Sequence, residues 1–185
     1  MEPKEQSAWP QPPSPPIRAS FTAQDAGCAL IIVVVLAAIL WPVFSDGHKA
    51  SKNLLCLSNM KWTNMALQLY AQDYDDRLPG RRWMDEANAY AKNWETFACP
   101  TVHLEDHRAY GFAFERTLAG KVTKGITKPE VQQLVYESSL LYKNTMAPVR
   151  DGLAKPGRHN RGNNVGFLDG HCKRISDGDA GKLWL

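Results

Sequence analysis

The sequence predicts an α+β fold in which one long N-terminal helix packs on a small antiparallel sheet. Three observations support this prediction. Residues 26–45 contain no charged side chain, apolar residues then recur at helical spacing as far as Tyr74, and Asp169-Gly170 separates two strand-like runs near the C-terminus. The length of 185 residues is enough for one domain of ordinary size and not for two.

The composition disfavours several classes of protein. Lys and Arg number 22 against 19 for Asp and Glu, so the chain lacks the strongly basic field of a nucleic-acid-binding protein. Apolar residues make up 44% of the chain although the mean hydropathy is −0.38, so they are concentrated in one segment. A disordered chain, a polytopic transporter and a disulfide-dense miniprotein are therefore disfavoured.

Residues 1–20 and 21–45 are expected to behave differently from the rest of the chain. Six of the first 16 residues are proline, so residues 1–20 form a leader that cannot bury a core and is expected to be disordered. Residues 21–45 predict a transmembrane helix, since about 20 apolar residues cross the bilayer core. The alternatives are a secretory signal cleaved near residues 43–45 and a buried core helix.

Residues 46–185 form the predicted head domain, and the helix continues into it. Apolar or small residues recur there at steps of four and three, which places them on one face of a helix that is amphipathic in this second half; they are Cys56, Met60, Thr63, Leu67, Tyr70 and Tyr74. The sequence Leu78-Pro79-Gly80 ends the helix.

The remaining elements are short. Residues 82–93 predict a helix with Trp83 on its apolar side, and residues 110–114 and 131–136 predict strands. Residues 164–168 and 171–175 flank Asp169-Gly170, which predicts a hairpin with a type I′ turn. The aromatic residues Trp62, Trp83, Tyr70 and Tyr74 are expected in the core between helix and sheet.

A C-terminal motif carries a resemblance to a known family. His159 is followed by nine residues and then by Asp169-Gly170. This H-x9-D-G motif, residues 56–61 and residues 70–75 resemble a bacterial group of type IV pilin-like (pseudopilin-like) proteins with a prepilin-type N-terminus. Weaker similarities lie at residues 97–100, 110–111 and 129–138, and the resemblance covers residues 21–175.

The resemblance implies a processing site between Ser20 and Phe21. Processed chains of the family begin with Phe-Thr and carry an acid at the fifth position, which Asp25 occupies here. Prepilin peptidase is then a partner, and Asp25 is the acid that pairs with a neighbouring subunit's amine and sets subunit register. Ser20 replaces the usual Gly and Asp25 the usual Glu, so an uncleaved anchor is the alternative.

The function implied by this resemblance is structural and non-enzymatic. The protein is expected in the cytoplasmic (inner) membrane as a single-pass chain, with its N-terminus in the cytoplasm and its C-terminal domain periplasmic or extracellular. It acts by assembly in a pilus or type II secretion-like system, or by surface display. Its partners are the lipid bilayer and other pilin-like subunits, with no nucleic acid, cofactor or metal. The alternative is an uncleaved membrane-anchored solute- or metal-binding module of the cell envelope; an anchored hydrolase is disfavoured because no nucleophile–base pair is visible.

The candidate site residues each have a structural interpretation as well. His159 and Asp169 are favoured as hairpin residues over metal ligands, because they do not form a complete catalytic constellation. A metal site on Cys99, His103 and His107, which are spaced by four, is disfavoured because no fourth ligand has a matching spacing.

The four cysteines are Cys28, Cys56, Cys99 and Cys172. Cys28 lies at the membrane edge and is expected to remain a thiol. Outside the cytoplasm the other three allow one disulfide, and Cys56–Cys99 is the favoured pair because it ties the helix to the loop before the sheet. The alternative is that all three are buried as small hydrophobic residues.

Overall fold

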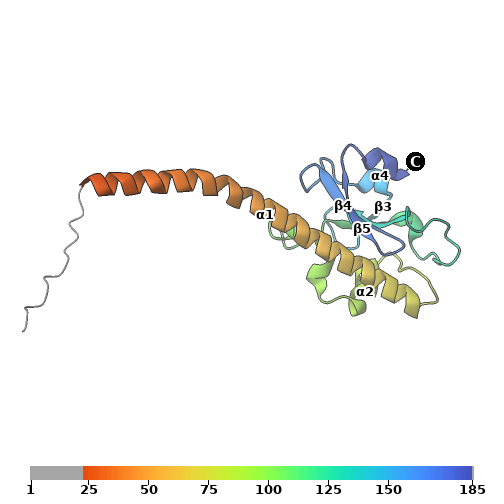
Figure 1. Cartoon of the computed structure of the whole chain (residues 1–185). Helices are drawn as coiled ribbons and strands as arrows, with labels where there is room; N and C mark the ends of the chain where they lie inside the picture. The colour runs from red at the N-terminus through yellow and green to blue at the C-terminus, as the bar shows by residue number, and fades with distance from the viewer. Residues whose placement is uncertain (1–22, 185) are drawn as a thin grey trace, which may run out of the picture. The chain divides into compact units, whose positions relative to one another are not determined.

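The computed structural model describes residues 23–184, with side chains undescribed over residues 42–50 and at residue 184 (Figure 1). The leader and the predicted processing site at Ser20 and Phe21 lie outside the described residues. The chain divides into two compact units, Met1–Val43 and Phe44–Leu185.

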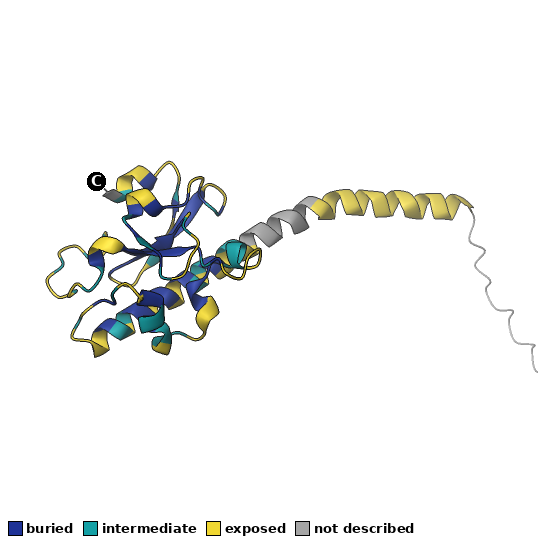
Figure 2. Cartoon of the chain, turned by 180° about the vertical axis from the view of Figure 1, so that it is seen from behind, coloured by how far each residue is buried: buried dark blue, intermediate teal, exposed yellow. Residues whose placement is uncertain are grey.

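Helix α1 (Ala23–Asp73) is continuous over 51 residues. Its first part, Ala23–Trp41, has a mean hydropathy of 2.3 and no buried residue, and it is long and apolar enough to cross a membrane. A signal sequence near an N-terminus has the same properties. Figure 2 shows this part exposed along its described length.

The second part of α1 packs into the head by one face. Cys56, Met60, Thr63 and Leu67 are completely buried, as the spacing predicts. Tyr74, predicted in the core, is 52% exposed. Its ring instead stacks on the half-buried Tyr70, with centroids 4.2 Å apart, at the end of the helix.

The head contains one five-stranded sheet in the order β3-β1-β2-β4-β5. The strands are β1 (Phe112–Glu115), β2 (Gln133–Glu137), β3 (Met146–Ala147), β4 (Gly162–Phe167) and β5 (Cys172–Ser176). Three neighbouring pairs are antiparallel, whereas β3 runs parallel to β1. The fold is α+β as predicted, but the sheet is only mostly antiparallel, since β3 is parallel to β1. The sequence did not predict β3, because a two-residue strand is too short to show any alternation of apolar and polar residues.

Short helices complete the head. The predicted helix over residues 82–93 is confirmed only in its first part, as α2 (Trp83–Ala87), and then tightens into a 3₁₀ turn at Asn88–Tyr90. Trp83 is completely buried, with its indole N–H bonded to the Thr145 carbonyl at 3.0 Å. Trp62, also predicted in the core, is 40% exposed and lies under the Lys92 ammonium. Two further helices are α3 (Pro100–His103) and α4 (Val149–Gly152).

Two apolar cores lie in the head. The larger contains the buried side chains of α1 and α2 with Phe112 and Phe114 of β1, and the smaller contains Ala113 of β1 and Tyr136 of β2. Neighbouring residues of a strand point to opposite faces, so α1 and α2 belong to the layer on one face of β1. The sheet therefore buries both faces, which explains why β1, β2 and β4 are buried along their whole lengths.

The β4–β5 hairpin is present, but its turn differs from the predicted one. Gly170 has a φ of +96°, whereas Asp169 is not among the residues with positive φ. The Gly170 N–H donates to the Phe167 carbonyl at 3.0 Å, and the Phe167 N–H donates to the His171 carbonyl at 2.9 Å. This is a three-residue connection with glycine in the left-handed position, so the type I′ prediction is wrong.

Candidate functional site

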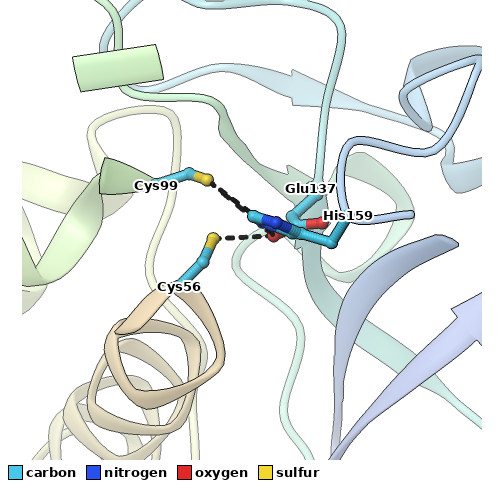
Figure 3. A group of neighbouring side chains, drawn as sticks. All are labelled: Cys56, Cys99, Glu137 and His159. Carbon is cyan, nitrogen blue, oxygen red and sulfur yellow. Dashed lines mark hydrogen bonds and ion pairs between the residues drawn. The ribbon is translucent and has the colours of Figure 1, made fainter. Parts of the chain in front are cut away.

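Four side chains from four separate segments converge inside the head (Figure 3). They are Cys56 of α1, Cys99 at the N-cap of α3, Glu137 at the end of β2, and His159 in the loop before β4. One potential ligand atom from each lies within 4.8 Å of all the others. The first three residues are 0% exposed and His159 is 5% exposed, so this Cys2GluHis cluster is a buried polar site.

Local backbone structure positions Cys99. Its N–H donates to the Tyr110 carbonyl at 2.7 Å, and its carbonyl accepts the His103 N–H at 3.0 Å. Pro100 follows at the first position of α3, where its missing N–H costs no helical hydrogen bond. Cys99 therefore lies at a fixed junction between a loop and a helix.

Glu137 and His159 are held by the sheet and its connections. Glu137 is paired with Phe112 across β1 and β2, and its carbonyl accepts the Ala154 N–H at 3.1 Å. The His159 N–H donates to the Gly162 carbonyl at 2.9 Å. The Arg174 guanidinium donates twice to the His159 carbonyl, at 2.9 and 2.7 Å, which fixes the loop that carries the imidazole.

One carboxylate oxygen is the centre of the cluster. The Cys56 thiol donates to Glu137 Oε1 at 2.6 Å, and His159 Nε2 lies 2.9 Å from the same oxygen. The Cys99 sulfur is 3.5 Å from His159 Nε2 and 3.9 Å from Glu137 Oε1. All four potential ligands thus point toward one small volume.

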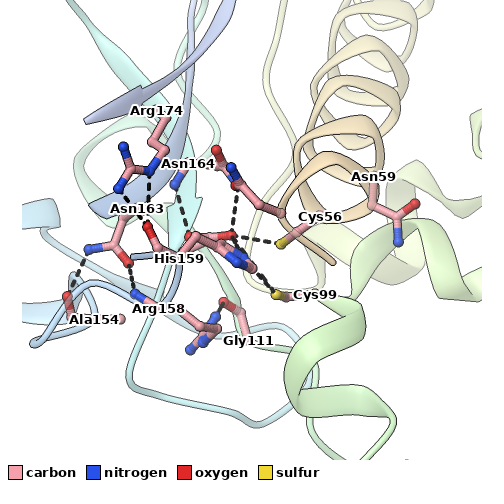
Figure 4. Close-up of polar contacts among 12 residues, drawn as sticks. Cys56, Asn59, Cys99, Gly111, Ala154, Arg158, His159, Asn163, Asn164 and Arg174 are labelled. Carbon is pink, nitrogen blue, oxygen red and sulfur yellow. Dashed lines mark hydrogen bonds and ion pairs between the residues drawn. The ribbon is translucent and has the colours of Figure 1, made fainter. Parts of the chain in front are cut away.

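Asn164 of β4 supports the carboxylate from outside the cluster (Figure 4). Its backbone N–H donates to Glu137 Oε2 at 2.9 Å, and its side-chain amide donates to Oε1 at 3.0 Å. Nearby, the Arg158 guanidinium donates to the carbonyls of Gly111 and Ser138. Because a buried carboxylate is costly unless it is hydrogen-bonded, the two hydrogen bonds from Asn164 to Glu137 are part of the site.

The cluster is strongly polarised. Burial raises the pKa of Glu137, but the hydrogen bond and charge of His159 outweigh it and hold the pKa below its usual value. Burial lowers the pKa of His159, yet contacts with Cys99 and Glu137 raise it to about 9. The Cys56 thiol lowers the pKa of Cys99 to about 5, whereas burial raises the pKa of Cys56. The shifts of Glu137, His159 and Cys99 therefore favour the charged forms of these three side chains at a buried site.

These residue types also occur in cysteine-based catalysis, but the geometry differs. A triad needs the orienting carboxylate on the imidazole nitrogen that faces away from the nucleophile. Here Glu137 and Cys99 both contact Nε2 of His159. The Cys99 sulfur is also completely buried, so a substrate has no access to it. The arrangement is therefore suited to holding a cation rather than to nucleophilic attack.

The two ends of the H-x9-D-G motif lie in different environments. His159 belongs to the buried cluster, not to the hairpin as the sequence suggested. Asp169 lies in the β4–β5 turn as expected, where its Oδ1 is 2.6 Å from Nδ1 of His171 and accepts the His171 N–H at 3.1 Å. Gly170 supplies the positive φ of the turn.

The spacing of Cys99, His103 and His107 does not produce a shared site. Nδ1 of His103 is 3.0 Å from the Ala109 carbonyl, and its ring packs edge-on against His107. Cys99 instead points into the buried cluster.

The structure brings Cys56 and Cys99 together, as the predicted disulfide requires, but as two free thiols. Their two sulfurs lie within 4.8 Å of each other, and both also contact the shared partner Glu137. Cys172 is a half-buried free thiol, and Cys28 is exposed on α1. Asp25, the predicted register acid, is exposed in the first turn of α1.

Sequence reasoning missed Glu137 as a site residue. The available signal was a glutamate that ends a strand otherwise buried as Leu134-Val135-Tyr136. A charged residue in that position needs a partner, and its partners in space come both from segments 38 and 81 residues earlier and from the later segment that contains His159 and Asn164. That convergence cannot be read from spacing.

The chain matches no protein-family model, no curated protein and no solved structure.

Proposed function

We propose that the protein is a non-enzymatic, membrane-anchored structural protein of the pilin-like (pseudopilin-like) type. Its N-terminal helix lies in the cytoplasmic membrane with the N-terminus in the cytoplasm, and its head lies on the periplasmic or extracellular side. It acts by assembly with pilin-like subunits in a pilus or type II secretion-like system, or by display at the surface.

The observation that carries this proposal is the two-part character of α1. Ala23–Trp41 is apolar and none of its residues is buried, whereas the later turns contribute to the core of the head. A helix that exposes Leu30, Ile31 and Val35 to solvent would be unstable in water, so it needs lipid or copies of itself around it. Both environments are available to a subunit that leaves the bilayer to enter a filament.

A second feature supports assembly. The later turns of α1 also carry large apolar side chains that the head leaves exposed; they are Leu54, Leu55, Trp62, Met65 and Leu69. Their exposed fractions lie between 39% and 65%. Neighbouring subunits packed along the helix would cover these side chains.

The alternative is an uncleaved membrane-anchored binding module of the cell envelope that does not polymerise. The Cys2GluHis cluster favours it, because a buried set of four potential ligands suits a metal. The two functions differ at the N-terminus, since a filament subunit loses its leader and a fixed anchor keeps it.

Intact-mass analysis of the chain extracted from membranes tests the proposal. A mature chain that begins with methylated Phe21 supports assembly, and a chain that begins with Met1 supports the fixed anchor. A chain that begins after residue 41 and is recovered without detergent contradicts both, because the apolar segment would then be a cleaved signal. Protease treatment of spheroplasts checks orientation, because the outer side of the cytoplasmic membrane is then accessible, and a head that resists digestion until the spheroplasts are lysed would refute the proposed topology.

Site-specific crosslinking tests assembly itself. A photoreactive residue in place of Leu69 should give crosslinked ladders in cells if subunits pack along α1. The same residue at the exposed Lys124 is the matched control and should give none. Equal yields of monomer at both positions would count against assembly.

A further inference from the structure

We infer that Cys56, Cys99, Glu137 and His159 form a structural zinc site in the head. The inference goes beyond the proposed function and does not depend on assembly. It rests on the identity, convergence and enclosure of the four side chains (Figure 3).

The distances are close to those of a tetrahedral zinc site. Zinc binds thiolate at about 2.3 Å and nitrogen or oxygen at about 2.0–2.2 Å, so its ligand atoms lie roughly 3.3–3.8 Å from one another. The Cys99 sulfur is 3.5 Å from His159 Nε2, within this range, and 3.9 Å from Glu137 Oε1, just above it. The two contacts at 2.6 and 2.9 Å are hydrogen bonds to Glu137 that the metal would replace. Lengthening each by less than about 1 Å needs only side-chain rotation.

The polar contacts around Glu137 also indicate the place of a cation. Its Oε1 atom receives three close contacts, from the Cys56 thiol, His159 Nε2 and the Asn164 amide. A buried carboxylate that accepts several hydrogen bonds at one oxygen also stabilises a positive ion beside that oxygen. Zinc would take the place of the thiol and imidazole protons there.

The set of ligands selects the metal. Magnesium and calcium require six or more oxygen ligands, and this site has one carboxylate. Two thiolates with one imidazole and one carboxylate match the sulfur, nitrogen and oxygen ligands that zinc takes in tetrahedral geometry. Four protein ligands leave no position for a substrate or a water molecule, so the role is structural.

The surrounding residues have the arrangement that metal ligands need. Asn164 holds both oxygens of Glu137, and Arg174 holds the His159 carbonyl (Figure 4). Such outer contacts orient the ligands before the metal arrives. The site would join α1 to the β2 end and to two loops, so the metal would cross-link segments as far as 103 residues apart in the chain, from Cys56 to His159.

Metal analysis of the full chain tests the inference. The protein is purified in detergent through a peptide-epitope tag without chelators, and its metals are measured by mass spectrometry. We expect about one zinc per chain. Replacement by Co²⁺ should give a thiolate-to-cobalt charge-transfer band and the visible bands of tetrahedral cobalt. These two measurements use the unmodified chain and need no variant to fold.

Variants assign the ligands. Cys99→Ser and His159→Gln should weaken zinc binding by more than the roughly 10–100-fold typical of outer-shell changes. The matched controls Cys172→Ser and His103→Gln, outside the cluster, should retain the metal. Circular dichroism confirms that each variant keeps its helix content.

Three outcomes would overturn the inference. The first is a chain without stoichiometric zinc that shows no cobalt bands. The second is a Cys56–Cys99 disulfide in freshly isolated protein, detected as a linked peptide pair. The third is zinc that the control variants lose and the cluster variants keep. None of these bears on the N-terminal mass that tests the proposed function.

Discussion

Asn164 binds both oxygens of Glu137, through its backbone N–H at 2.9 Å and its side-chain amide at 3.0 Å. Both residues are completely buried. Asn164 belongs to β4 and Glu137 to the adjacent strand β2. A single residue of the sheet therefore fixes the carboxylate that the two cysteines and His159 surround.

Replacing this amide should weaken the fold. We expect Asn164→Leu to lower the free energy of unfolding by about 1–3 kcal/mol, because one hydrogen bond to a buried carboxylate is lost. Urea unfolding followed by circular dichroism measures the change. Gln72→Leu, which replaces an exposed amide on α1, is the control and should be nearly neutral. Equal midpoints for the two variants would contradict the role given to Asn164.

Removing the charge of Glu137 should lower the free energy of unfolding by more than Asn164→Leu does. In metal-stripped protein, Glu137→Gln leaves His159 buried without its carboxylate partner, which lies 2.9 Å away. Breaking a buried ion pair in this way typically costs about 3–5 kcal/mol. The exposed Glu130→Gln is the comparison in the same urea titration. A loss of under about 1 kcal/mol at Glu137 would show that the pair is unimportant in the metal-free state.

Zinc should stabilise the folded chain by mass action. At free zinc 1,000-fold above the dissociation constant, one site on the native state adds about 4 kcal/mol. Thermal unfolding in zinc and in chelator measures this increment. The increment should largely vanish in His159→Gln and persist in His103→Gln. Superimposable melting curves for the unmodified chain in both buffers would contradict a site formed only in the native state.

The Asp85 carboxylate gives a pH-dependent contribution away from the cluster. Hydrogen bonds from Lys143 and Asn144 hold its pKa below the usual value despite partial burial. Because the folded pKa is lowered, this stabilisation is present above the unfolded pKa and is lost as the pH falls through the folded pKa. Asp85→Asn should therefore be about 0.5–1 kcal/mol less stable than the unmodified chain at neutral pH. The difference should shrink below about pH 4, and a gap that widens in acid would contradict the assignment.

The apolar part of α1 should tolerate no charge if it lies in lipid. The double variant Val33→Arg, Leu36→Arg places two cations in the middle of this segment. Inserting each into the bilayer centre costs about 2.5–3.5 kcal/mol on insertion scales. We expect the chain to be released from membranes by alkaline carbonate, which leaves the unmodified protein bound. The control is Leu55→Arg, which changes an exposed leucine in the later part of the helix. Undiminished retention of the double variant would exclude a membrane-spanning role.

Much of the fold could be predicted because its signals are local. The uncharged run, the four-and-three spacing that buries Cys56, Met60 and Leu67, and the hairpin around Asp169-Gly170 each depend on neighbours in the chain. The predictions were wrong in detail where packing between distant segments of the chain determines the structure. Nothing in the sequence near Tyr74 shows that its ring remains half exposed and stacks on Tyr70, and the parallel edge strand Met146–Ala147 is defined only by its partner β1.

The site could not be predicted for the same reason. Local sequence patterns assign Cys56, Cys99 and His159 to three different structures: a disulfide, a helix-face metal site and a hairpin. No local pattern marks Glu137 as a site residue. Their convergence depends on how α1 lies on the sheet and on the loop held by Arg174, and both are products of the whole head. The spacing of Cys99, His103 and His107 was a false local signal, because Cys99 is turned inward at the start of α3.

Cys56 is the first completely buried residue among the described residues of α1. Any tension transmitted along the helix into the head meets this turn before it reaches Met60 or Leu67. A zinc–thiolate bond there would make the attachment of α1 to the head more rigid while the metal is bound. Oxidation of the cysteines or loss of the metal would remove this cross-link. The packing of the head around α1 would then vary with the supply of the metal.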